Sequence, residues 1–590
     1  MYGYMGCVLE VDLTSETMWS EPLDERLARR FIGGKGLGAK LLWDGVEAGI
    51  DPLGPQNPLI FITGPLTGTL APTSARFTVV TKSPLTGIYL DSHVGGYWGP
   101  WLKFAGFDCL IVGGKASKPT YLWVHDGEAE LKDATWLWGK GCWDTEKLLR
   151  EVYPKAKVAS IGPAGEHLVR YACITTELYR HAGRGGAGAV AGSKRLKAVV
   201  VEGNKRPIYA NPERFKETVK KAFRRIRETP SMSIRRHYGT PYWVKPMNQG
   251  GLLPTRNFSE GVFEEADQIS AERLRETLVI EDKGCYNCPV KCGKLSRVKG
   301  KYGCEVEGPE YETIALLGSN CGIGSLEAIA KANALCDDLG LDTISTGNVL
   351  GFTAECGERG LIETKMRFGD ADEAIRLIGK IAYREGAGDT LAEGVWRISK
   401  KVGGREFAMH VKGMEIPGYD PRGAIGMALA YATSDRGACH QRAWSARAEL
   451  QGDLKPRHSI EGRARFIKEA QDERAACFSL VLCDFMPFGV EDFVDLLKYA
   501  TGFDYSQEEY LSCGERIWNL ARLFNCREGI QRKDDALPKR FGEAMPEGEA
   551  KGIRITQQML DQMLDEYYEL RGWDQQGVPT REKLDELGLL

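Results

Sequence analysis

The chain has 590 residues, of which 43% are hydrophobic and 27% charged, and its formal net charge is −3. This length predicts about three to four domains of ordinary globular composition. The balanced charge gives no electrostatic support for a nucleic-acid partner, and no apolar run approaches the roughly 20 residues of a membrane span. Acidic residues near the N-terminus stand where a signal peptide needs a positive region, so we expect a cytoplasmic protein.

Residues 1–208 have the pattern of β-strands. Short apolar or alternating runs lie between Gly, Pro, Asn and Asp, and the clearest are CVLEVDLT, LIFITGP, RFTVVTKS, DCLIVGG, TYLWVHD and LKAVVVEG. We interpret glycine-rich stretches such as FIGGKGLGAK as loops that let backbone amides approach a ligand. The sequence therefore predicts a strand-rich N-terminal domain over residues 1–208.

From about residue 209 the pattern becomes helical. An Asn-Pro pair is typical of a helix start, and long runs with helical periodicity follow it. A segment rich in Gly and Pro at 413–426 divides this part into two mainly α-helical domains, 209–417 and 418–590. We expect an α+β protein, with a surface loop from about 531 that leads into a terminal helix at 556–571.

The stretch GCYNCPVKCG carries Cys285, Cys288 and Cys292, the only group with ligand spacing among 16 cysteines. Three sulfurs on one loop fit a [4Fe-4S] cube, whose fourth ligand is usually distant in sequence. A structural zinc site usually shows a second pair of Cys or His residues, and the eight histidines form no such pair. The sequence leaves four candidates for the fourth ligand, which are Cys483, Cys304, Cys321 and Cys477.

Two polar segments suit anionic ligands. In LCDDLGLDTIST, a helix is predicted to end at Gly340, and the next helix is predicted to be capped by Asp342 or Thr343. The alternative is that these residues only end one helix and start the next, without binding a ligand. The segment RHAGRGGAGAVAGSK (180–194) formally matches the glycine motif of dinucleotide-binding folds. It is too short for a full βαβ crossover before the next strand, so we reject this interpretation. We interpret it as an anion-binding nest flanked by Arg184.

Two further segments carry candidates for acid–base chemistry. Glu307, Glu310 and Glu312 come before an apolar stretch, where they act in proton transfer or simply form a capped first helical turn. His440 lies in TSDRGACHQRAW among two arginines, an aspartate and Cys439. A lone histidine is more often a hydrogen-bonded structural group than a catalytic one.

Together, in this order, these pieces resemble the tungsten-containing aldehyde:ferredoxin oxidoreductase family over essentially the whole chain. The matching segments are FIGGKGLGAKLLWD, TSARFTVVTKSPLTG, GRGGAGAVAGSK, CYNCPVKCG, EGPEYET, CDDLGLDTIST and TSDRGACH. Members of this family hold one metal between two pyranopterin dithiolenes, next to a single [4Fe-4S] cluster. The resemblance implies tungsten or molybdenum, which the residues do not distinguish.

The resemblance also implies a set of ligands and contacts. The cluster ligands would be Cys285, Cys288, Cys292 and Cys483. The cofactor contacts would be Arg76, Gly95, Arg184, Asp337, Leu341, Asp342 and Asp484. The Mg²⁺ that bridges the pterin phosphates would take the carbonyl oxygens of His93 and Gly185. The chain departs from the family pattern at His93, usually Asn, and at Phe478 and Val481, which replace Asp and Gly of the second pterin motif.

For the chemistry, the resemblance implies that Glu312 is the base and that His440 hydrogen-bonds the substrate oxygen while an aldehyde becomes a carboxylic acid. Cys321 is either a metal ligand, as in class II benzoyl-CoA reductases, or a small buried thiol. The electron acceptor would be a ferredoxin or a ferredoxin-like subunit, with or without a flavin subunit that reduces NAD. No E-x-x-H motif supports an iron bridge between two copies.

Two alternatives remain open on the sequence. The first is a reductase of an aromatic thioester, similar to class II benzoyl-CoA reductase. The second is a non-catalytic iron–sulfur or zinc scaffold.

Overall fold

The computed structural model describes all 590 residues, and its first sheet has the strand order β2-β1-β6-β3-β4-β5. These strands are β1 (Cys7–Asp12), β2 (Thr17–Pro22), β3 (Leu59–Ile62), β4 (Phe77–Lys82), β5 (Tyr89–Val94) and β6 (Cys109–Gly113). β1 and β6 run parallel, and the other neighbouring pairs are antiparallel. β3 and β4 are buried along their whole length, which explains the continuous apolar sequence of β3.

The second sheet has the order β11-β10-β9-β12-β7-β8. Its strands are β7 (Thr120–His125), β8 (Glu128–Asp133), β9 (Lys157–Ser160), β10 (Ile174–Thr176), β11 (Arg180–Ala182) and β12 (Leu196–Glu202). All six runs singled out in the sequence are strands, namely β1, β3, β4, β6, β7 and β12. The strand-rich N-terminal region is therefore confirmed.

Six helices accompany these sheets: α1 (Glu25–Phe31), α2 (Gly34–Gly45), α3 (Trp98–Ala105), α4 (Cys142–Val152), α5 (Pro163–Glu166) and α6 (Ala187–Ser193). The interpretation of FIGGKGLGAK as a loop was wrong, because most of this stretch forms α2. Its glycines serve close packing instead. A Cβ added to Gly38 would stand 2.6 Å from Val80 of β4, and one added to Gly36 would stand 2.5 Å from Ile517.

The middle of the chain is mainly helical, as predicted. Its helices are α7 (Pro212–Glu228), α8 (Pro230–Tyr238), η1 (Thr240–Trp243), α9 (Val244–Gln249), η2 (Ala266–Ile269), α10 (Ala271–Thr277), η3 (Gly300–Tyr302), α11 (Tyr311–Leu317), η4 (Ser319–Cys321), α12 (Leu326–Leu339), α13 (Thr343–Glu358), α14 (Ala371–Tyr383), α15 (Ala387–Leu391), α16 (Val395–Val402) and η5 (Arg405–Phe407). Asn211 caps α7, with Pro212 in its first turn.

Five strands within this helical region were not predicted. β13 (Val279–Lys283), β14 (Gly293–Val298) and β15 (Cys304–Glu307) form an antiparallel sheet, and β16 (His410–Val411) pairs with β17 (Met414–Glu415). They are short and carry charged residues, so periodicity alone does not distinguish them from loops.

The C-terminal region is helical. Its helices are α17 (Gly426–Thr433), α18 (Ser445–Gln451), α19 (Arg463–Leu480), α20 (Val490–Thr501), α21 (Gln507–Arg527), η6 (Arg532–Asp534), η7 (Lys539–Gly542), α22 (Gln557–Arg571) and α23 (Arg581–Glu586). α22 matches the predicted terminal helix within one residue. The α+β fold class is confirmed, while the boundaries of the three domains stay a prediction.

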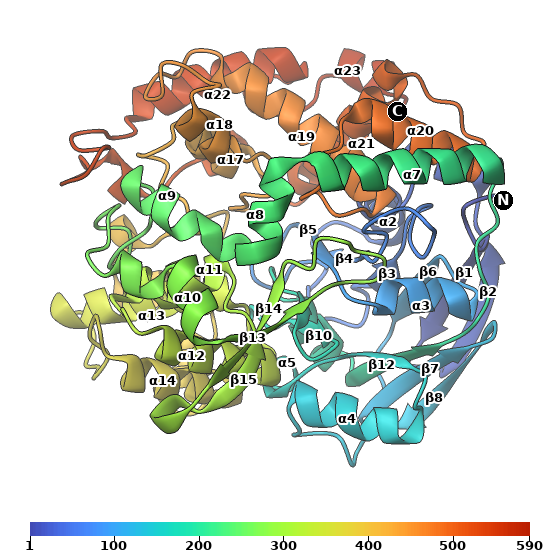
Figure 1. The fold of residues 1–590 in the computed structure, drawn as a ribbon, viewed down its shortest axis with the longest axis horizontal. Helices are drawn as coiled ribbons and strands as arrows, with labels where there is room; N and C mark the ends of the chain where they lie inside the picture. Colours follow the sequence, from blue (N-terminus) through green and yellow to red (C-terminus); the bar gives the residue numbers. More distant parts are fainter.

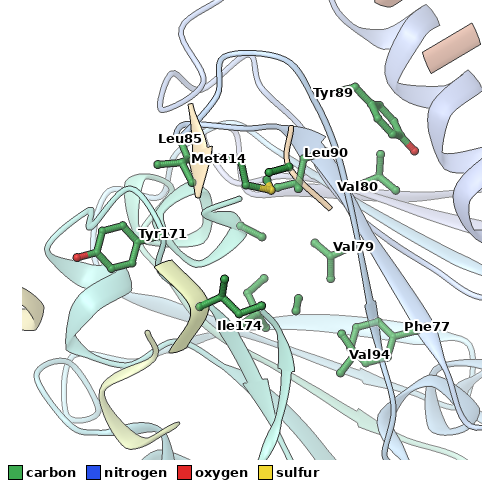
Figure 2. Close-up of a cluster of buried hydrophobic side chains, with 14 of the residues drawn as sticks. Phe77, Val79, Val80, Leu85, Tyr89, Leu90, Val94, Tyr171, Ile174 and Met414 are labelled. Atoms are coloured by element: carbon green, nitrogen blue, oxygen red, sulfur yellow. The ribbon is translucent and has the colours of Figure 1, made fainter. Parts of the chain in front are cut away.

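The three regions share one core. In Figure 1 the N-terminal strands lie at the right and lower right, most of the middle helices at the left and the C-terminal helices along the top, with α7 of the middle region at the upper right. A single buried apolar cluster runs from Tyr4 to Trp573 and includes residues of all three regions. In Figure 2, Val79 of the first sheet, Ile174 of the second and Met414 of β17 belong to one buried group. Met414 lies beside Leu85 and Leu90 in this group, so the middle of the chain contacts the N-terminal region there.

No single helix is both long and apolar enough to cross a membrane, and one pair, Tyr311–Cys321 with Leu326–Leu339, passes that test only with a bend of 117° between its members.

The glycines of α2 provide a stability test. We expect Gly36→Ala to destabilise the protein by about 1–3 kcal/mol, because the new methyl group would overlap the carbonyl oxygen of Phe31 and press on Ile517. Gly45→Ala in the same helix meets no atom within 4 Å, so it should be neutral or slightly stabilising. The thermal unfolding midpoints of the two cofactor-loaded variants check this, and equal midpoints would contradict the packing argument.

Candidate active site

The cysteine-rich loop joins two antiparallel strands, β13 and β14. Asn287 and Lys291, which directly precede Cys288 and Cys292, have left-handed φ angles of 49° and 52°. The backbone N–H of Cys288 also donates to the carbonyl of Cys285 over 3.1 Å. These tight turns keep the three cysteines on one short loop.

The N-terminal region holds this loop in place. The side-chain amide of Asn287 donates to the carbonyls of Leu70 and Ala71, at 2.9 and 2.8 Å. The backbone N–H of Tyr286 donates to the carbonyl of Gly96 over 2.9 Å. The loop therefore lies against the segments that carry Arg76 and Gly95.

Cys483 reaches the same place from the C-terminal region. It follows α19, which ends at Val481 in a left-handed conformation with φ of 62°. Nη2 of Arg76 lies 3.4 Å from the sulfur of Cys483, and Nη1 lies 3.1 Å from Asp484 Oδ1. Burial raises the pKa of the Cys483 thiol, and the positive charge of Arg76 opposes that rise.

The structure brings the four predicted cluster cysteines together. Burial is the main cause that raises the pKa of Cys288 to about 11, and the nearby thiols of Cys483 and Cys285 add to it. Burial likewise raises the pKa of Cys292, with Glu310 and then Cys285 as the next causes. A Cβ added to Gly95 would stand 2.9 Å from the sulfur of Cys285, so this glycine leaves the sulfur its space.

The positions of these cysteines in the chain fit a polynuclear cluster. No group of three or more His, Cys, Asp or Glu side chains is packed closely enough to hold a single metal ion. Four thiolates on one zinc ion would each lie about 2.3 Å from it, whereas an iron–sulfur cube separates its ligands to its corners. Three cysteines on one loop, with a fourth from a distant segment, match the ligand pattern of a [4Fe-4S] cluster.

The predicted pterin segment has the local structure expected from its sequence. α12 ends at Gly340, which adopts the left-handed conformation, and Asp342 caps α13 by accepting from the N–H of Ile344 over 3.0 Å. Arg184 Nε lies 3.2 Å from the other carboxylate oxygen of Asp342. Its two terminal nitrogens donate to the carbonyls of Ala438 and Glu415, each at 2.8 Å. Arg184 thus links three distant segments.

Asp337 leaves one buried acceptor free. Its Oδ1 accepts from Asn333 over 2.9 Å and lies 3.0 Å from His181 Nε2, whereas its buried Oδ2 has no hydrogen-bond partner. Because buried polar atoms are nearly always paired, this oxygen fits the N–H donor of a bound pterin. Leu341 is buried beside it and forms a β-bridge with Ala172.

The residues predicted to hold Mg²⁺ present their backbone rather than their side chains. The ring of His93 is occupied by Thr78 at 3.0 Å and Asp91 at 2.7 Å, and burial is the main cause that lowers its pKa to about 4. Gly185 has a φ of 83°, and its carbonyl accepts from the hydroxyl of Ser83 over 2.7 Å. A carbonyl oxygen has a second lone pair that remains available to a cation.

Glu312 and His440 face one another. Glu312 stands in the first turn of α11, and its Oε2 accepts from the N–H of Gly418 over 2.8 Å. Its Oε1 lies 3.4 Å from Nδ1 of His440, and neither of these buried atoms has a hydrogen-bond partner. Each of them is therefore available to a substrate or a water molecule.

The pKa values of this pair are shifted in opposite directions. Burial raises the pKa of Glu312 to about 7, although the N–H of Gly418 and the charge of Arg184 lower it. Burial lowers the pKa of His440 to about 3, and the charges of Arg184 and Arg436 add to this effect. At neutral pH the histidine is uncharged and the carboxyl group is close to its midpoint, which suits proton transfer.

Aromatic side chains lie on one side of His440. The ring of Tyr419 is 5.4 Å from it, Trp444 is 5.7 Å from Tyr419, and Trp243 is 4.9 Å from Trp444. The indole Nε1 of Trp444 is buried without a partner. One side of His440 is therefore aromatic, whereas the charges of Arg184 and Arg436 also act on it.

Cys321 lies at the other end of α11 from Glu312. Its thiol is fully buried and donates to the carbonyls of Leu316 and Gly347, at 3.3 and 3.4 Å. Burial raises its pKa to about 12. These contacts favour the interpretation of a small packed thiol over that of a metal ligand.

The sequence analysis missed a group of buried charges beside the site. Lys35 of α2 pairs with Asp91 at 3.2 Å and also with Asp435, and Arg442 Nε lies 3.1 Å from Asp435. All four side chains are at most 2% exposed. The sequence signal for these buried charges was the presence of charged residues inside glycine-rich or apolar segments. It was overlooked because the segment around Lys35 was interpreted as a loop.

Two other arginines were missed as well. Arg436 donates to the sulfur of Cys439 over 3.1 Å, and it helps to lower the pKa of that buried thiol against the effect of burial. Arg180 pairs with Glu307 next to the cysteine loop. Nε of Arg436 and Nη1 of Arg442 are buried without acceptors, which fits an anionic cofactor in this part of the molecule.

The fourth cluster ligand can be tested directly. We expect Cys483→Ala to lose most of the bound iron and acid-labile sulfide, because a [4Fe-4S] cluster would lack its fourth thiolate. Cys477→Ala removes a buried thiol only six residues away and should retain about four irons per chain. Iron and sulfide analysis of both purified variants provides the comparison, and iron loss from Cys477→Ala alone would overturn the assignment.

Comparison with known proteins agrees with this geometry. Residues 8–203 match the N-terminal domain of aldehyde ferredoxin oxidoreductase, and residues 217–589 match its domains 2 and 3. Proteins named tungsten-containing aldehyde ferredoxin oxidoreductase from Pyrococcus furiosus and Pyrococcus abyssi are each 44% identical, over 100% of this chain and 99% of their own length. The BamBC active-site complex of benzoyl coenzyme A reductase, solved with 1,5-dienoyl-CoA, has a similar fold, with a TM-score of 0.87 at 26% identity over 100% of this chain and 97% of its own.

These matches confirm the resemblance inferred from the sequence, and they exclude the alternative of a non-catalytic iron–sulfur or zinc scaffold. The four thiols and the unpaired buried polar atoms fit the cofactors of the matched family. The chain belongs to the aldehyde ferredoxin oxidoreductase family, whose members are oxidoreductases that use a tungsten–pterin group and a [4Fe-4S] cluster.

Proposed function

We propose that this protein oxidises an aldehyde to a carboxylic acid. Water supplies the added oxygen, and two protons and two electrons are released. The observation that carries the proposal is the buried pair of Glu312 and His440, which face each other with unpaired atoms. When bound, the tungsten–pterin group supplies Lewis acidity and uptake of both electrons, and the cluster supplies their transfer one at a time. The relatives named as aldehyde ferredoxin oxidoreductases support this choice of substrate.

The residues assigned to the cofactors follow from the same argument. We assign the cluster to Cys285, Cys288, Cys292 and Cys483, and the pterin contacts to Arg76, Gly95, Arg184, Asp337, Leu341, Asp342 and Asp484. His93 and Gly185 would offer carbonyl oxygens to Mg²⁺. Cys321 is left out of the metal ligands, because its thiol is directed at two backbone carbonyls.

Glu312 would take the proton from the attacking water. With a pKa of about 7, it is ionised in about half of the molecules at neutral pH, and it is basic enough to accept a proton. The N–H of Gly418 fixes one carboxylate oxygen, so the other is presented to the reacting groups.

His440 would orient the substrate oxygen as a neutral donor. A neutral imidazole carries one N–H and one acceptor nitrogen. If Nε2 donates to the substrate oxygen, Nδ1 is left as the acceptor toward Glu312. The carboxylic acid of Glu312, once protonated, can then donate to Nδ1, so one proton movement strengthens both hydrogen bonds.

A ferredoxin or a ferredoxin-like subunit is the electron acceptor we propose, in a cytoplasmic enzyme. The names of the close relatives support this acceptor. A flavin subunit that reduces NAD is a further proposal of the same kind, supported by the lack of an E-x-x-H motif for an iron-bridged dimer in this chain.

Reduction of an aromatic thioester is the second candidate, because the fold is similar to that of the BamBC complex. The 44% identity to the aldehyde-oxidising relatives and the packed position of Cys321 favour the aldehyde. A panel of aliphatic and aromatic aldehydes, tested beside benzoyl-CoA, separates the two. We expect turnover with aldehydes and none with the thioester.

Replacement of the base is the most direct test of this mechanism. We expect Glu312→Gln to lower kcat by about 10²–10⁴-fold while tungsten and iron contents are unchanged, because the amide cannot accept a proton. Glu327→Gln is the matched control, since Glu327 also stands in the first turn of a neighbouring helix, α12, but bonds only Ser325. A Glu312→Gln enzyme that retains normal turnover would refute the base assignment.

The pH profile gives an independent test. Glu312 accepts a proton only when ionised, so kcat/KM should be constant well above pH 7 and fall tenfold per pH unit below its pKa of about 7. The pKa of His440 is about 3, so this histidine should add no limb between pH 5 and 9. Steady-state rates across that range provide the measurement, and an acidic limb centred near pH 4.5 would show an unperturbed carboxylate instead.

A further inference from the structure

The cysteine loop opens onto the surface through a hollow of about 480 Å³. Cys285 and Cys288 are half-buried there, while Asn287 and Lys291 are exposed. Phe223, from the distant helix α7, lines the same hollow. The predicted cluster therefore lies beneath a surface formed by its own loop and by one face of α7, which crosses the front of the molecule in Figure 1.

This face of α7 is basic. Phe223 and Arg224 stand three and four residues after Lys220, and Arg227 stands four and three residues after them, so these side chains lie along one side of the helix. The three cations are exposed and surround the aromatic ring that lines the hollow. None of them forms an ion pair within the chain, although the protein has a net charge of −3.

The acidic residues of the hollow are already neutralised. Glu281 pairs with Lys283 at 2.6 Å, and Asp282 pairs with Lys294 at 3.0 Å and with Arg275. Lys291, in contrast, is exposed and has no ion-pair partner, and it lies within the cysteine loop. The surface over the cluster is thus locally positive, and its positive charges are free to meet another molecule.

We propose that this surface, formed by Lys220, Phe223, Arg224, Arg227 and Lys291, docks a small acidic iron–sulfur protein that takes up the electrons. The inference rests on the proposed function and adds to it the place and chemistry of electron exit. Unpaired charges on an exposed rim mainly increase the rate of encounter with a partner of opposite charge. The half-buried cysteines give that partner a short path to the cluster.

A second copy of the chain is a poorer occupant of this surface. Two identical subunits related by a two-fold axis through the face would bring the same basic residues against each other. Repulsion between these like charges opposes such a contact, whereas an acidic carrier removes it.

Charge reversal on α7 tests the proposal. We expect Lys220→Glu/Arg224→Glu to lower kcat/KM for a purified acidic bacterial-type ferredoxin by about tenfold or more at low ionic strength. The control, Arg214→Glu/Lys221→Glu, reverses two exposed charges on the far side of the same helix from Phe223 and should change it less than about twofold. Aldehyde oxidation with a small viologen dye should be unchanged in both variants, because neither pair touches the active site.

Three results would overturn the proposal: an equal loss in both variants, no loss in either, or a matching loss with the dye. Dissociation of a homo-oligomer by the first variant alone, seen by size exclusion, would show a contact between copies instead. The proposed function is tested separately, since a wild-type holoenzyme that fails to oxidise aldehydes with the dye refutes it. Binding of oxidised ferredoxin to the holoenzymes, measured by calorimetry, still tests the docking surface in that case.

Discussion

The buried side chain of Arg184 connects the segments that form the active site. Arg184 leaves the N-terminal region and bonds Asp342 at the start of α13, the carbonyl of Glu415 in β17 and the carbonyl of Ala438. The last contact lies two residues before His440, so the same side chain also fixes the loop that carries the histidine. Removal of Asp342 would leave this buried charge uncompensated, at a cost of about 3–5 kcal/mol.

The same arginine sets part of the electrostatics of the site. Its charge lowers the pKa of Glu312 and that of His440, so it favours an ionised base and a neutral histidine together. Burial opposes it at Glu312 and reinforces it at His440. If Glu312 were more deeply buried and lacked Arg184, its pKa would rise further and it would be protonated at neutral pH. If it were more exposed, its pKa would be lower and it would be too weak a base. The observed balance depends on both effects.

The sequence predicted the local structure well and the long-range structure poorly. Six strands, the long helices and the cap at Asp342 follow from periodicity and turn chemistry, which are local properties. The glycines of α2 indicate a loop by sequence alone, because the residues they pack against, Val80 and Ile517, cannot be identified from the local pattern. Only the resemblance selected Cys483 among four candidate thiols. The short distance between Glu312 and His440 depends on the path of the whole intervening chain, so no local sequence pattern predicts it.

Three ion pairs in the cofactor region join a cation of residues 1–208 to an anion of the helical regions: Arg76 meets Asp484 at 3.1 Å, Arg180 meets Glu307, and Arg184 meets Asp342 at 3.2 Å. Asp91 and Arg442 form a pair of the opposite sense. Four thiolates and the phosphates of two pterins would add further negative charge to the same side, which unpaired donors such as Arg436 Nε can accept. Cofactor binding should therefore strengthen the attraction between the regions. The ion pairs join the regions around the site, and the unpaired donors supply positive charge for the negative groups of the cofactors.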